Sequence, residues 1–99
     1  MGEEYYKYYV ISMFSDEKKH KEIYDFIRKD KVHKETIFMI DVTSKDGFED
    51  AEKNCILKLP MLVLFNLNNN PIDRFYTLKE IKKHFIHKRV IDCMTNNNE

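Results

Sequence analysis

The segment from Cys55 to Phe65, with the sequence CILKLPMLVLF, places a proline at the start of a short apolar strand. A proline is tolerated at the first residue of a strand, because its missing N–H need not join the hydrogen-bond ladder. Inside a central strand the same residue would remove a ladder hydrogen bond. We therefore expect the strand to occupy residues 61–65 and to begin directly after Pro60.

Upstream of this proline, two β-branched and aromatic runs alternate with two amphipathic segments. Residues 5–14 (YYKYYVISMF) and 35–42 (ETIFMIDV) have the composition of strands. Residues 16–29 and 44–54 carry apolar side chains at spacings of three and four, which predicts helices. In the second helix Phe48, Ala51 and Cys55 would form a small apolar face.

Downstream, the sequence indicates a β-hairpin followed by a helix. Asparagines at 68–70 form a turn signal, and residues 71–76 alternate as a hairpin partner of strand 61–65 would. Thr77-Leu78-Lys79-Glu80 is a T-x-x-E capping box, so a helix is expected to begin there and to run to about Lys88. Residues 90–99 are expected to form a polar C-terminal tail.

The resulting element order, βαβαββα, predicts the α/β class. Strands that alternate with helices favour a parallel first pair joined by a right-handed crossover, and the hairpin adds an antiparallel pair. We therefore expect one domain over residues 1–99, with a four-stranded mixed sheet flanked by three helices. A chain of 99 residues, 42% of them hydrophobic, can bury one modest core.

Charge and cysteine content exclude several classes of function. Seventeen basic and seventeen acidic residues give zero net charge, so nucleic acid is an unlikely partner, and no apolar run is long enough to span a membrane. Cys55 and Cys93 have neither CxxC nor metal-site spacing, which indicates free thiols in the cytoplasm or another reducing compartment. No cofactor or metal site is expected.

The abundance of Lys, Asn, Ile and Tyr, with Ala51 as the only alanine, is typical of an AT-rich genome.

Residues 39–86 resemble the second half of a thioredoxin, and the segment around Pro60 resembles the cis-proline loop of the thioredoxin and glutaredoxin superfamily. Asp41 stands at the end of a strand where the family has an aspartate, and Leu59-Pro60 falls on the cis dipeptide. The resemblance implies a thioredoxin-like fold with a cis Leu59–Pro60 bond. It also implies that Leu59 presents its backbone to an extended ligand, such as a peptide or glutathione.

The thiol chemistry of that family requires cysteines at the turn between the first strand and the first helix, where the helix N-terminus lowers a thiol pKa. Here residues 14–19 read FSDEKK and contain no cysteine. The acidic side chains of Asp16 and Glu17 would further disfavour an anion at this turn. The expected protein is therefore redox-inactive and is not a thiol oxidoreductase.

These features together predict a protein-binding module, as a subunit or adaptor of a larger assembly that could be viral. The expected contact surface faces the proline loop and comprises Ser15, Asp16, Glu17, Lys18, Leu59 and Pro60. The alternative is a glutathione-transferase-like ligand-binding or catalytic domain, in which Ser15 or a tyrosine of strand 5–14 stabilises a thiolate supplied by the ligand.

The remaining polar and aromatic groups are interpreted structurally. His84 and His87 are three residues apart without further ligands, so they predict solvated side chains and no metal site. His20 and His33 are likewise expected to be solvated, and Cys55 to pack behind the proline loop. The tyrosines at 5, 6, 8 and 9 alternate along a strand, so they would enter cores on both faces of the sheet, and any excess would mark a protein contact.

Overall fold

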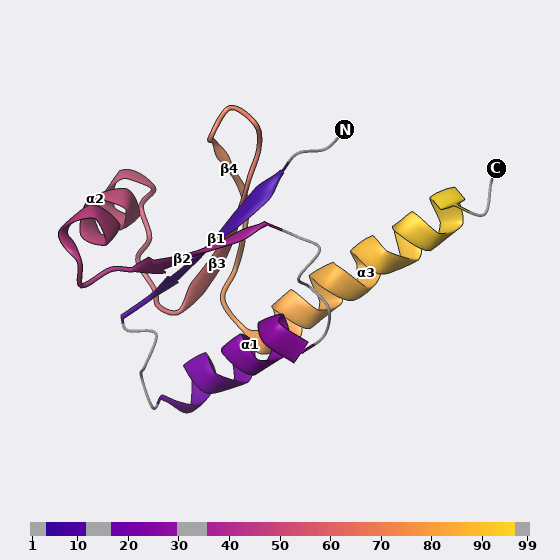
Figure 1. Cartoon of the computed structure of the whole chain (residues 1–99), viewed down its shortest axis with the longest axis horizontal. Coiled ribbons are helices and arrows are strands. Elements are labelled where there is room, and N and C mark those ends of the chain that lie inside the picture. The colour runs from indigo at the N-terminus through magenta and orange to yellow at the C-terminus, as the bar shows by residue number, and fades with distance from the viewer. Residues whose placement is uncertain (1–3, 12–16, 30–35, 97–99) are drawn as a thin grey trace.

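A computed structural model describes residues 4–11, 17–29 and 36–96 of the chain (Figure 1). Its elements follow the predicted order: β1 (Tyr5–Val10), α1 (Lys18–Lys29), β2 (Ile37–Asp41), α2 (Lys45–Lys53), β3 (Met61–Phe65), β4 (Pro71–Phe75) and α3 (Leu78–Asn96). The α/β class, the four-stranded mixed sheet and the three helices are confirmed for the part of the chain that is described.

The sheet has the strand order β2-β1-β3-β4. Strand β1 pairs in parallel with β2, in a register that places Tyr6 beside Ile37. It pairs antiparallel with β3, where Tyr9 lies opposite Met61, and β3 forms the predicted hairpin with β4. Strands β1 and β3 are therefore central, and β2 and β4 are the edges of the sheet.

Helices cover both faces of the sheet (Figure 1). Helices α1 and α3 lie together on one face, where Ile23 and Phe26 of α1 meet Ile81 and Phe85 of α3 in the larger core. Helix α2 lies on the other face and contributes Ala51 to a smaller core. All five residues of β3 are buried, as expected for a strand that is covered on both sides.

The tyrosines of β1 enter both cores, as their alternation predicts. Tyr6 and Tyr8 face α1 and α3, and Tyr9 faces α2. All three side chains are fully buried, whereas Tyr5 is half-buried and stacks on Phe65 with ring centroids 5.3 Å apart. The described tyrosines at the start of β1 therefore belong to the interior and do not form the exposed excess that would mark a protein contact.

Each buried tyrosine hydroxyl forms a hydrogen bond with a side chain of a different helix. Tyr8 Oη lies 2.8 Å from His20 Nδ1 of α1, and Tyr6 Oη lies 2.7 Å from His84 Nε2 of α3. Tyr9 donates to Asp50 Oδ1 of α2 at 2.6 Å. These bonds matter because a buried hydroxyl without a partner costs about 1–3 kcal/mol.

The expectation that the histidines of α1 and α3 are solvated is wrong for two of them. His20 is buried, with 2% of its surface exposed, and His84 is half-buried. The physical reason is that each imidazole supplies the hydrogen-bond partner that a buried tyrosine hydroxyl needs. His87 is exposed as expected, and His33 lies outside the described residues.

Helix α2 begins in very close contact with the end of β2. Ser44 caps the helix by accepting a hydrogen bond from Gly47 N at 3.0 Å, and its own hydroxyl donates to the Asp41 carbonyl at 2.8 Å. Gly47 is buried, and a Cβ at this position would collide with the carbonyl oxygen of Asp41. The glycine is therefore required here by space.

We predict that Gly47→Ala destabilises the protein by about 1–3 kcal/mol, the usual cost of overpacking. At an ordinary helix position the same change would stabilise by roughly 0.5–1 kcal/mol. Urea denaturation followed by circular dichroism measures the difference, and the exposed neighbour variant Glu49→Ala serves as control. A Gly47→Ala protein as stable as the parent would contradict the close contact.

A polar cluster fastens α2 to the sheet around Asp50. The carboxylate accepts hydrogen bonds from Lys7 Nζ at 2.6 Å, from Tyr9 Oη at 2.6 Å and from Asn54 Nδ2 at 2.8 Å. Burial raises the pKa of Asp50, but these hydrogen bonds and the charge of Lys7 outweigh it and hold the pKa below the ordinary value. Burial and the Asp50 hydrogen bond raise the pKa of the Tyr9 hydroxyl.

We predict that the stabilisation from Asp50 is pH-dependent. Because the folded-state pKa lies below the unfolded value of about 3.9, the carboxylate stabilises the fold above that pH, and this contribution disappears as the pH falls through the folded pKa. Asp50→Asn should cost about 1–3 kcal/mol at pH 7 and progressively less below about pH 4. Urea titrations at several pH values test this, with the exposed Glu52→Gln as control. A cost that is independent of pH would contradict the role of the charge.

Two elements differ from the prediction by more than two residues at one end. Strand β1 ends at Val10, whereas the strand composition continues to Phe14; Ile11 is exposed, and residues 12–16 lie outside the description. Helix α3 continues to Asn96, well past Lys88, so residues 90–96 are helical and do not form a tail. The sequence after Lys88 contains neither glycine nor proline to end the helix. No described helix is long and apolar enough to cross a membrane.

Candidate functional site

The proline loop joins the end of α2 to the start of β3. The Leu59–Pro60 peptide bond is cis, the isomer that the family resemblance implies. Pro60 is buried directly before β3, and Leu59 is half-buried against the smaller core. Leu57 points outward, with 89% of its surface exposed. The loop is therefore anchored by Pro60 and Leu59, and it exposes the apolar side chain of Leu57 to solvent.

The start of the loop is set by the way α2 ends. Cys55 has a left-handed backbone with φ of 57°, and its N–H donates to the Glu52 carbonyl at 3.2 Å. The N–H of Ile56 donates to the Ala51 carbonyl at 2.9 Å, and both side chains belong to the smaller core. This pair of hydrogen bonds with an apolar contact is a Schellman motif, in which glycine is the usual left-handed residue.

The expectation that Cys55 packs behind the loop is wrong, because its side chain is an exposed free thiol. Because Cys55 adopts the left-handed conformation, its side chain points outward, and the side chain of Ile56 packs against the smaller core instead. Phe48 is also exposed, which leaves only Gly47 and Ala51 as buried residues of α2. The helical spacing thus predicted Ala51 correctly, but it was wrong for Phe48 and Cys55.

Arg74, a residue of the hairpin strand β4, also fixes the start of the loop. Its guanidinium donates to the Asn54 carbonyl at 2.8 Å and to the Cys55 carbonyl at 3.3 Å. These carbonyls lie at the C-terminal end of α2, where the helix dipole favours a cation. The first turn of the loop is thus fixed both by its own backbone and by the hairpin.

The start of α1 and the proline loop meet at the ring of Tyr76. Lys19 Nζ lies 2.9 Å from the ring centroid, and Lys58 Nζ lies 5.2 Å from it. A cation over an aromatic face is stabilised by roughly 0.5–1 kcal/mol at an exposed site. Tyr76 therefore brings a residue near the start of α1 and a residue of the loop to one surface.

The N-terminal cap of α3 holds the backbone of Tyr76 in place. Glu80 Oε1 accepts hydrogen bonds from Tyr76 N and Thr77 N at 2.9 and 3.0 Å, and Glu80 N donates to Thr77 Oγ1 at 3.1 Å. The predicted capping box is thus confirmed. The same hydrogen bonds, with the charge of Lys19, hold the pKa of Glu80 below its ordinary value.

The structure describes four of the six predicted site residues. Ser15 and Asp16 lie outside the described residues, and Glu17 and Lys18 are exposed at the start of α1. Together with burial of the hydroxyl, the charge of Glu17 raises the pKa of Tyr8. On the α1 side, the residue that reaches the Tyr76 ring is Lys19, which the prediction did not include.

An open pocket of about 350 Å³ lies beside the loop, and its lining includes Leu57, Lys58, Arg74, Tyr76 and Glu80. None of these five belonged to the predicted site. Leu57 and Lys58 directly precede the predicted dipeptide, but their exposure could not be read from an apolar run. The lining, which also includes the exposed thiol of Cys55, combines an aliphatic side chain, an aromatic ring and cations, groups that can contact a peptide segment. No group of three or more potential metal ligands occurs among the described residues.

The comparisons with known proteins give no family for this chain: no protein-family model and no curated protein matches the sequence.

We predict that Cys55→Gly stabilises the protein by about 1 kcal/mol, because glycine adopts the left-handed conformation without the steric cost that other residues incur. Cys55→Ala is the matched control: it also removes the thiol but keeps the Cβ, so it should change stability little. Urea denaturation of the three proteins measures the difference. Equal stability of the glycine and alanine variants would contradict the backbone role of this position.

Proposed function

We propose that this chain is a redox-inactive thioredoxin-like module that binds a partner protein, as a subunit or adaptor of a larger assembly. The parallel β1–β2 pair, the β3–β4 hairpin, the helices on both faces and the cis Leu59–Pro60 bond are all features that such a fold requires. The turn before α1 has no cysteine at residues 14–19. These observations favour a scaffold of that type without its disulfide chemistry.

The observation that carries the binding proposal is the exposure of Leu57. A leucine with 89% of its surface in solvent contributes nothing to the core, and it stands beside Lys58 on a loop held by Arg74 and the Schellman motif. An aliphatic side chain on a fixed backbone can enter a pocket of a partner with little loss of conformational entropy. Lys58, above Tyr76, would then face a polar or acidic rim of that partner.

We expect Leu57→Ser, alone and with Lys58→Glu, to weaken partner binding by tenfold or more, the loss of about 1.4 kcal/mol that removal of an anchor residue produces. The first measurement is affinity capture by the wild type from a lysate of the source cells, with mass spectrometry, followed by titration of the captured partner. Leu67→Ser is the matched control, because Leu67 is also exposed, at 66%, but lies in the β3–β4 turn.

Three outcomes would overturn the proposal. Equal affinity of the Leu57→Ser and Leu67→Ser variants would show that the loop is not the contact. Saturable glutathione binding that shifts the Leu59 amide resonance would instead support a glutathione-transferase-like domain. Thiol-dependent reduction of insulin disulfides that disappears in Cys55→Ser would show that the protein is a redox enzyme.

A further inference from the structure

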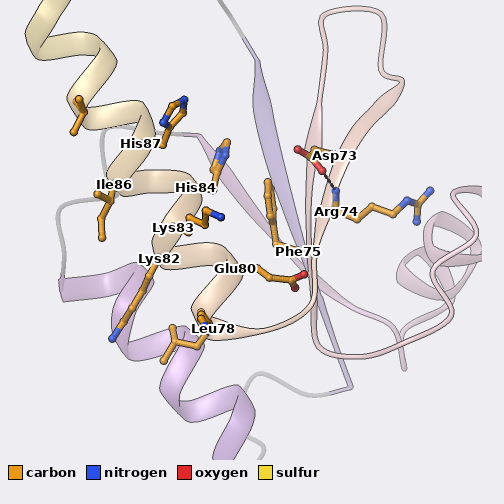
Figure 2. Close-up of a pocket in the computed structure, with 12 residues that line it drawn as sticks. Asp73, Arg74, Phe75, Leu78, Glu80, Lys82, Lys83, His84, Ile86 and His87 are labelled. Carbon is orange, nitrogen blue, oxygen red and sulfur yellow. Dashed lines mark hydrogen bonds between the residues drawn. The ribbon is translucent and has the colours of Figure 1, made fainter.

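A second surface, away from the proline loop, lies where helix α3 passes the edge strand β4. It is an open groove of about 1170 Å³, with Phe75, Leu78, Ile86 and Val90 as its apolar lining. Ile86 and Val90 are 54% and 50% exposed, so this face of α3 is not covered by another described element. Figure 2 shows Ile86 projecting from α3, while Phe75 of β4 faces His84, with ring centroids 4.5 Å apart.

The polar lining of the groove carries a net positive charge. Lys79, Lys82 and Lys83 follow one another along α3, and none of them forms a salt bridge with another described residue. The acidic side chains in the lining are already engaged by backbone donors. Asp73 Oδ1 accepts from Arg74 N at 2.9 Å, and Glu80 caps α3. Lys82 Nζ lies 5.8 Å from the ring centroid of Phe26, so it already has an aromatic contact. Carboxylates of an occupant would therefore pair best with Lys79 and Lys83, which form no salt bridge with another described residue.

The edge of β4 is poorly suited to accept a further strand. The strand is five residues long and begins with Pro71, and its pairing with β3 is irregular between Leu64 and Phe65. The Asp73 side chain also occupies the N–H of Arg74 (Figure 2). Short length, proline, irregular pairing and charge are the features that protect sheet edges from strand addition. A helix, which brings its own backbone hydrogen bonds, is the better occupant.

A second copy of this chain fits the groove less well than an acidic partner. A two-fold dimer contact uses the same patch on both subunits, so it would bring the lysines of both grooves into one interface. Like charges placed close together oppose association, whereas an acidic partner would gain both attraction and faster encounter.

We propose that the groove between β4 and α3 binds an acidic amphipathic helix of a partner protein. From Lys79 to Val90 the groove follows about three turns of α3, or roughly 16 Å. A partner helix of that length would present apolar side chains to Ile86, Val90 and Leu78, and carboxylates on its flanks to the lysines. The proposal does not rest on the function proposed for the proline loop.

The test uses a synthetic helical peptide of about 16 residues, roughly 24 Å long, with leucines on one face and glutamates on both flanks. A second peptide has lysine in place of every glutamate. Fluorescence anisotropy measures affinity for the full-length protein, and amide chemical shifts locate the contact. We expect the acidic peptide alone to bind, with shifts at Ile86, His87 and Val90, and with affinity that falls as salt rises from about 50 to about 300 mM.

Variants at exposed positions give the matched comparison, because they leave the cores intact. Ile86→Ser with Val90→Ser should weaken binding of the acidic peptide by at least tenfold, and Lys79→Glu with Lys83→Glu by a similar factor. Leu67→Ser and Leu57→Ser should leave it unchanged, which separates this groove from the proline loop. Circular dichroism confirms that each variant is folded.

Several results would overturn the proposal. These are equal binding of the two peptides, no saturable binding of the acidic peptide up to about 1 mM, or shifts centred on Leu57 or Phe48. Concentration-dependent dimerisation that Ile86→Ser abolishes, measured by light scattering, would assign the groove to a second copy of the chain instead.

Discussion

The requirement that each buried tyrosine hydroxyl of β1 find a hydrogen-bond partner governs how the helices are placed on the sheet. Tyr6, Tyr8 and Tyr9 are fully buried, yet each carries a hydroxyl that water would otherwise satisfy. The three partners come from three different helices, α3, α1 and α2 respectively. Apolar packing supplies most of the cohesion between layers, but it is non-directional, whereas a hydroxyl at 2.6 to 2.8 Å from its partner fixes a particular turn of each helix.

The candidate binding loop inherits its geometry from these attachments. The bond from Tyr8 to His20 holds the first turns of α1 against the sheet, which places the neighbouring Lys19 at the ring of Tyr76. The bond from Tyr9 to Asp50 holds α2, and the end of α2 determines where the proline loop begins. The two halves of the surface around Tyr76 are thus positioned by adjacent residues of one strand.

Local signals in the sequence predicted much of the fold. Strand β3 after Pro60, the hairpin and the capping box at Thr77 depend on nearest neighbours, and the structure has all three where they were expected. The features that were missed depend on distant partners. The burial of His20 and His84 follows from tyrosines that are remote in sequence, and a helical pattern cannot distinguish an imidazole that meets a hydroxyl from one that meets water. The exposure of Cys55 follows from its left-handed backbone, at a position where the sequence has no glycine to mark the turn.

The hydrogen bonds from one strand to three helices also constrain how this sequence can diverge in evolution. Replacing Tyr8 by phenylalanine would remove the hydroxyl that His20 contacts, so substitutions at these two positions are expected to depend on each other. The same reasoning links Tyr9 with Asp50 and Tyr6 with His84. Substitutions at two contacting residues have non-additive effects on the free energy of unfolding, with interaction energies commonly of about 0.5–3 kcal/mol. We therefore expect β1 to diverge in matched pairs of substitutions, with each pair linking the strand to one helix and largely independent of the other two.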